Sequence, residues 1–135
     1  MNSLNQTKRV TWAGRIISAL PILFFLFDSA IKFTRIQPVV DSFTQLGYRP
    51  SISVGIGLLE LACMVVYLIP RTSIFGAILL TGYLGGAIAS HLRVGDPLFS
   101  HVLFPIYVAA PLWGGLLLRD ARLRSMLFLR TSPAY

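Results

Sequence analysis

Residues 51–92 read SISVGIGLLELACMVVYLIPRTSIFGAILLTGYLGGAIASHL, two long apolar blocks divided by Pro70 and Arg71. Each block approaches the roughly 20 residues that a helix needs to cross about 30 Å of hydrocarbon. Proline interrupts a helix, and the dividing turn is short, so the two helices must lie antiparallel. The stretch therefore predicts a pair of neighbouring transmembrane helices.

Two more apolar blocks flank this pair, one on each side. We expect four spans, at about residues 11–33, 51–69, 72–92 and 102–118, followed by a basic tail at 119–135. The composition agrees, because 55% of the 135 residues are hydrophobic, only 13% are charged, and the mean hydropathy is +0.71. The sequence predicts one all-α domain, an antiparallel four-helix bundle in the membrane.

The connector between the first two spans, residues 34–50, is longer than the other two. Its apolar residues Val39, Val40, Phe43 and Leu46 alternate with polar ones at a spacing that suggests one apolar helix face. Such a pattern favours a short helix lying at the membrane interface.

The first apolar block has a second interpretation, as a cleaved signal peptide. Arg15 and Pro21 interrupt its apolar stretch, and no clear small-residue cleavage site follows. A signal peptide has a basic end, a short apolar core and such a site, so we expect a retained span.

The distribution of basic residues predicts the orientation in the membrane. Most of the 12 lysines and arginines would lie in the cytoplasm if both termini did, whereas Lys32, Arg35, Arg49 and Arg93 would lie outside. This bias favours the N-in, C-in topology. The net charge of +7 is then explained by these basic flanks, which interact with anionic lipid head groups. No base-stacking or groove-reading element is visible, so nucleic acid is not an expected partner.

Small residues in the third span predict close helix packing. Gly82, Gly85 and Gly86 form this face, and small side chains let helix backbones approach in a membrane. We expect the contact inside the bundle, with a homo-oligomer contact as the alternative. Pro105 and Pro111 are expected to kink the fourth span and open a cavity there.

Besides Arg15, three charged residues fall within the first two spans. Asp28 and Lys32 are one helical turn apart and can pair. Glu60 lies near the expected midplane, where a carboxyl with no cation nearby should be neutral. Glu60→Gln should then fold better than Glu60→Ala.

Four polar residues sit around the turn between the third and fourth spans. His91, Arg93 and His101 should reach one outer depth, with Asp96 between them. Together with Asp28, Lys32 and Glu60 they suggest a polar pocket that opens outward. The alternatives are anchoring of Lys32 and Arg93 at head groups, and an Asp28 that only neutralises Lys32.

Known catalytic patterns are missing from the sequence. Cys63 is the only cysteine, so a dithiol relay is excluded, and no nucleophile or nucleotide-binding motif appears in a suitable context. The two histidines lack a tight ligand spacing, so we expect neither haem nor a bound metal ion.

One stretch resembles a known family. Residues 67–91 and 93–101, together with Ser29-Ala30-x-Lys32 and Gly57-Leu-Leu-Glu60, are similar to the DoxX-like family of small bacterial membrane proteins. The resemblance implies a four-helix bundle in the bacterial inner membrane and a polar cluster of Lys32, Glu60, His91 and His101. It implies no single reaction, because relatives include a subunit of a thiosulfate:quinone oxidoreductase and an assembly chaperone for receptors.

Two classes of function follow. In one, the pocket binds a quinone or another amphipathic molecule, and the protein is an accessory subunit of a membrane redox complex. In the other, the bundle is a chaperone or assembly factor that contacts partner transmembrane helices, and no chemistry is required.

Overall fold

The computed structural model describes residues 2–128, and every regular element in this range is helical. The elements are α1 (Asn2–Thr34), α2 (Gln37–Gln45), η1 (Pro50–Ile52), α3 (Ser53–Leu68), α4 (Ser73–Arg93), η2 (Leu98–Val102), α5 (Phe104–Arg119) and α6 (Ala121–Phe128). Four helical stretches are long and apolar enough to cross a membrane: Asn2–Thr34, Pro50–Leu68, Ser73–Arg93 and Leu98–Arg119. The predicted all-α membrane bundle is confirmed. Residues 129–135 of the expected basic tail lie outside the described range.

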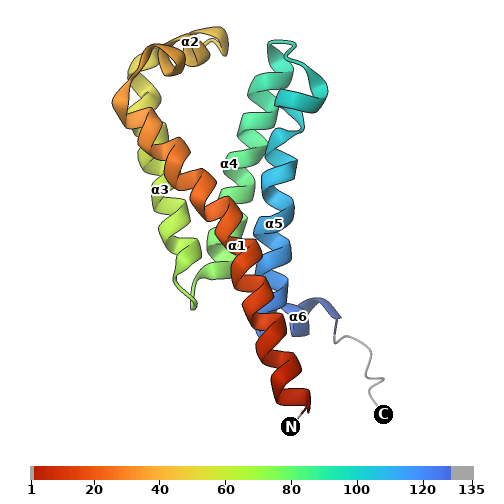
Figure 1. The fold of residues 1–135 in the computed structure, drawn as a ribbon. Coiled ribbons are helices and arrows are strands. Elements are labelled where there is room, and N and C mark those ends of the chain that lie inside the picture. Colours follow the sequence, from red (N-terminus) through yellow and green to blue (C-terminus); the bar gives the residue numbers. More distant parts are fainter. Residues whose placement is uncertain (1, 129–135) are drawn as a thin grey trace.

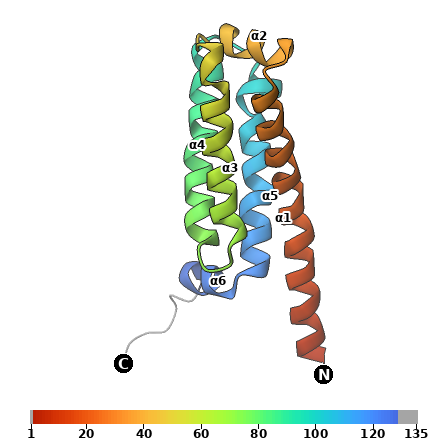
Figure 2. The same cartoon turned by 90° about the vertical axis from the view of Figure 1, so that its left-hand side faces the viewer.

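The four long helices run alternately up and down and form a ring. Helix α1 packs against α3 and α5, and α4 completes the ring by packing against the same two helices. Figures 1 and 2 show the start of α1 and helix α6 at one end of the bundle, with α2 and the turn between α4 and α5 at the other. We refer to these as the terminal end and the α2 end.

Helix α2 occupies the connector in which a short helix was expected. It begins with Gln37 and Pro38, and proline is tolerated in a first helical turn because the amide there has no partner within the helix. Val39 and Phe43 are buried under it, and Gly47 has a positive φ of 80° that lets the chain turn back. The helix lies across the end of the bundle (Figure 2).

Glycines hold the terminal end together by letting helices touch. A Cβ on Gly14 of α1 would lie only 2.8 Å from the carbonyl oxygen of Gly115 in α5. Gly76 of α4 touches the backbone of Tyr67 in α3, whose buried hydroxyl donates to the carbonyl of Leu112 at 2.8 Å. Backbones this close exclude any side chain, so the bundle is tight at this end.

The three glycines expected to pack inside the bundle do not do so. A Cβ added to Gly82, Gly85 or Gly86 meets no other atom of the described chain within 4 Å. The prediction of an intramolecular contact is therefore wrong for these residues, because Gly82 and Gly86 line the open cavity and Gly85 is exposed outside it. The homo-oligomer alternative stays a prediction.

The α2 end is splayed. Figure 1 shows α1 and α3 leaning together on one side and α4 and α5 on the other. Pro111 lies inside α5, but Pro105 stands in its first turn and does not interrupt it, contrary to expectation. A π-helical turn, η2, precedes α5 instead. The separation of the two helix pairs creates the space described next.

Candidate functional site

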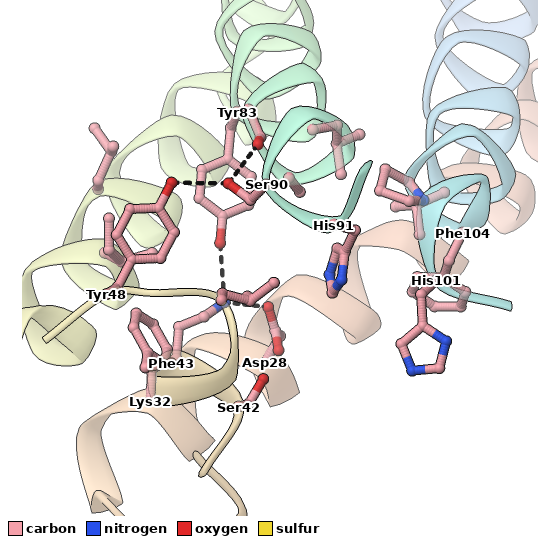
Figure 3. A pocket seen from close by; sticks show the side chains of 18 of the residues that line it. Asp28, Lys32, Ser42, Phe43, Tyr48, Tyr83, Ser90, His91, His101 and Phe104 are labelled. Atoms are coloured by element: carbon pink, nitrogen blue, oxygen red, sulfur yellow. Dashed lines mark hydrogen bonds and ion pairs between the residues drawn. The ribbon is translucent and has the colours of Figure 1, made fainter. Parts of the chain in front are cut away.

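A cavity of about 560 Å³ occupies the α2 end and is partly open to the outside. Its walls are mostly apolar and come from α1, α2, α3, α4 and α5, with Phe24, Phe43, Leu59, Phe104 and Val108 among them. Asp28, Lys32, Tyr83, His91 and His101 are among the polar residues of the lining, with Ser42, Tyr48 and Ser90. Figure 3 shows these side chains around the space. The volume falls within the range of small-molecule sites.

Lys32 is the centre of a polar cluster at this cavity. Its ammonium group contacts the carboxylate of Asp28 and donates to the Tyr83 hydroxyl at 2.9 Å (Figure 3). It also lies 2.7 Å from Oε2 of Glu60. The Tyr83 hydroxyl in turn lies 3.1 Å from Oε2 of Glu60, to which it donates. The cluster thus joins α1, α3 and α4 at the point where the helix pairs separate.

The approach of α3 to α1 explains why Glu60 reaches Lys32. Gly57 faces α1, and a Cβ there would lie 3.1 Å from Cβ of Lys32. The buried Ser53 hydroxyl, one turn earlier, donates to the carbonyl of Lys32 at 3.2 Å. Glu60 is three residues after Gly57 and so lies on the same face of α3. Its side chain then meets the ammonium group.

Glu60 is completely buried and does not line the cavity. The expectation of a carboxyl with no cation nearby is wrong, because α1 brings Lys32 within ion-pair distance. Only Oε2 is engaged, and Oε1 has no hydrogen-bond partner in the described structure. A charge at this depth is costly without a partner, so Lys32 and Glu60 depend on each other.

The two histidines stand on the opposite wall. Nδ1 of His91 lies 2.6 Å from Oδ2 of Asp96, and Nδ1 of His101 lies 2.7 Å from the Ser100 hydroxyl. The two rings are edge to face, with their centroids 5.8 Å apart. The two rings therefore lie next to each other, but neither contacts the Lys32 cluster by any hydrogen bond or ion pair.

Arg93 does not line the cavity. Its guanidinium donates to the carbonyl of Leu46 and lies over the Tyr48 ring, 5.8 Å from the centroid. Nearby, Gln45 donates to Asp96 at 3.2 Å. These contacts join the segment that follows α2 to the end of α4. Arg93 therefore acts outside the cavity lining, through its contacts with Leu46 and Tyr48.

Comparison with known proteins adds one finding. The sequence model of the DoxX-like family matches residues 16–115, a range that includes all four spans in most of their length and the whole cavity lining. The chain belongs to the DoxX-like family. No curated protein and no solved structure gives a significant match. The DoxX-like chain is therefore an integral, multi-pass membrane protein, and its site must be interpreted from its own residues.

Sequence reasoning missed Tyr83, whose hydroxyl contacts both Lys32 and Glu60 in the site of this DoxX-like protein. Tyr83 is the one tyrosine of residues 72–92, and a phenol in an apolar span needs a hydrogen-bond partner, so a signal was present. Tyr48 and Ser90, whose hydroxyls lie 2.8 Å apart, were missed as well. Among residues 2–128, no three or more His, Cys, Asp or Glu side chains gather as they would around a metal ion.

Proposed function

We propose that this DoxX-like protein binds an amphipathic small molecule of the quinone type in the cavity at the α2 end. The observation that carries the proposal is the lining, in which apolar walls enclose a floor of charged and hydroxyl groups at Asp28, Lys32 and Tyr83. Pockets with apolar walls and a few convergent polar groups suit a ligand with an apolar body and a polar head. The head group would lie at the floor.

The same proposal includes an accessory role without catalysis of its own. A quinone-type molecule carries electrons between membrane proteins, so a bundle that holds one would serve a membrane redox complex as a subunit. His91 and His101 line the cavity, and imidazole can exchange protons near neutral pH. If the protein lies in the bacterial inner membrane with both termini in the cytoplasm, the cavity opens on the outer side of that membrane.

Two glycines on α4 give a matched test of ligand binding. Gly86 lines the cavity, whereas Gly85 does not, and neither would meet another atom if a Cβ were added. Gly86→Leu should fill the cavity and weaken binding of decylubiquinone to the purified protein at least tenfold, measured by equilibrium dialysis in detergent. Gly85→Leu should bind like the wild type. Absence of binding by the wild type, or equal loss in both variants, would contradict the proposal.

The exposed small residues of α4 favour a second candidate, an assembly factor that contacts a partner helix. Gly85 and Ala89 are exposed, and the space above Gly85 is open. A photo-crosslinking amino acid at Ala89 would then give one discrete adduct in native membranes. Gly85→Leu should abolish this adduct and leave decylubiquinone binding intact, which separates the two functions.

A further inference from the structure

We infer that the cavity selects a head group that donates hydrogen bonds, and hence a hydroquinone over the corresponding quinone. This inference rests on the proposed function and specifies its ligand. At the cavity floor the hydrogen-bond donors are already engaged within the protein, whereas acceptors remain free.

The donors of Lys32 are all in use. An ammonium group has three N–H bonds and no acceptor. The three bonds point to Asp28 Oδ2, to Glu60 Oε2 at 2.7 Å and to the Tyr83 hydroxyl at 2.9 Å. A quinone carbonyl, which can only accept, would have to displace one of these partners. Each displaced carboxylate or hydroxyl would lose a bond inside the membrane.

The hydroxyl protons near the floor are in use as well. Tyr83 accepts from Lys32 and gives its proton to Oε2 of Glu60. Ser90 donates to the carbonyl of Gly86 at 2.9 Å, so Tyr48 must be the donor in the contact between Tyr48 and Ser90. Neither tyrosine therefore has a proton left for a ligand.

Acceptor capacity remains at two places in the lining. Asp28 uses Oδ2 for Lys32, Oδ1 has no recorded partner, and the side chain is 34% exposed. At His91, the neighbouring Asp96 carboxylate can only accept, so Nδ1 carries a proton, and in the uncharged form of the ring Nε2 is an acceptor. The donors that remain, the Ser42 hydroxyl and His101, belong to exposed residues at the mouth.

The formal charges point the same way. Lys32 contributes one positive charge, whereas Asp28 and Glu60 together contribute two negative ones when ionised. With both carboxylates ionised, the cluster has a net negative charge, which repels an anionic head group and attracts the positive end of an O–H bond. A hydroquinone carries two O–H groups at the positions where the quinone has carbonyl oxygens. It can therefore donate a hydrogen bond to Asp28 and leave every hydrogen bond of Lys32 in place.

The test uses three probes with one ring and one tail: decylubiquinone, its hydroquinone under anaerobic conditions, and the dimethyl ether of that hydroquinone. We expect the hydroquinone to bind the purified protein at least tenfold more tightly than either of the others. A tenfold preference raises the midpoint potential of the bound two-electron couple by about 30 mV, which a redox titration of the bound probe would detect.

Two variants test whether Asp28 is responsible for the preference for the hydroquinone. Asp28→Asn replaces an acceptor with an amide that also donates, so the preference for the hydroquinone should fall to about threefold or less. Asp41→Asn changes an exposed carboxylate of α2 outside the lining and should leave the preference unchanged. Equal binding of quinone and hydroquinone by the wild type would overturn the inference but not the proposed function. Binding of neither probe would overturn both.

Discussion

Lys32 is the residue on which the site depends, because it is 9% exposed and has two carboxylate partners. Glu60→Gln and Asp28→Asn each leave it one carboxylate, so each single variant should stay close to the wild type in stability. The double variant leaves a buried cation without a carboxylate. We expect its loss in unfolding free energy to exceed the sum of the single losses by about 1 to 3 kcal/mol. Unfolding of the purified protein in mixed detergent micelles measures this difference.

A matched control comes from Glu60→Ala. This variant removes both charge and acceptor, so Tyr83 would lose the group to which it donates, at a cost of about 1 to 3 kcal/mol. Glutamine should therefore be tolerated better than alanine, but because Asp28 remains beside Lys32 and not because Glu60 lacks a cation. Additive single and double variants would show that the two carboxylates do not share Lys32.

One half of the cluster follows from residue spacing along a single helix, whereas the other half was implied only by the family resemblance. Asp28 and Lys32 are four residues apart on one helix, and this spacing alone places them together. The contact of Lys32 with Glu60 depends on how α3 is rotated and shifted against α1. The close approach at Gly57 determines that placement, and nothing in the local sequence marks Gly57 as a contact.

At the level of helices, α6 has a defined start. Asp120 precedes it, and the Asp120 carboxylate accepts from the backbone amides of Arg122 at 2.9 Å and Leu123 at 3.3 Å. This is the arrangement of an N-terminal cap. The carboxylate also pairs with the guanidinium of Arg122 at 2.9 Å. Its position outside the spanning helices makes it accessible to titration.

The hydrogen bond from Arg122 lowers the pKa of Asp120 below its ordinary value. A lowered pKa in the folded state means that this carboxylate stabilises α6 at pH values above about 4 and loses that effect as the pH falls through the folded-state pKa. Amide hydrogen exchange in residues 122–126, corrected for its intrinsic pH dependence, should therefore show protection that falls as the pH drops below about 4. Asp120→Asn should flatten that dependence, and an unchanged profile would contradict the capping role.

The glycines illustrate what the sequence could not predict about the helices. The Gly82 to Gly86 spacing is typical of close packing, yet Gly14 and Gly115 make such a contact and have no glycine partner four residues away. Whether a small residue touches a neighbour depends on where the helix axes cross. That crossing is a property of the assembled bundle.

For the whole molecule, hydropathy and length were enough to predict four spans, because lipid forces every backbone polar group to find its partner within a helix. The connector helix followed from its apolar spacing. The splay at the α2 end could not be predicted in this way. The helices are held close by glycine contacts at the terminal end, whereas bulky residues such as Phe24, Phe104 and Tyr83 stand between them at the α2 end.

Orientation in the membrane can be tested with reporter fusions. The bias of lysine and arginine predicts that a reporter after Tyr135 is active in the cytoplasm, whereas one inserted at Gly95 is active outside. Gly95 has a positive φ of 76° in the turn after α4, at the end of the bundle opposite α6, which is the last described helix. The reverse result would turn the cavity towards the cytoplasm.

The ring of helices also constrains the order of events during synthesis. The contact between α1 and α5 joins residues as distant as Ser18 and Arg119, so the ring cannot close until the last span has left the ribosome. Lys32 is made before Glu60 and would enter the bilayer without it. Asp28, on the same helix, accompanies the cation from the start. Because the Asp28–Lys32 pair has no net charge, the first span can insert into the bilayer before Glu60 has been made.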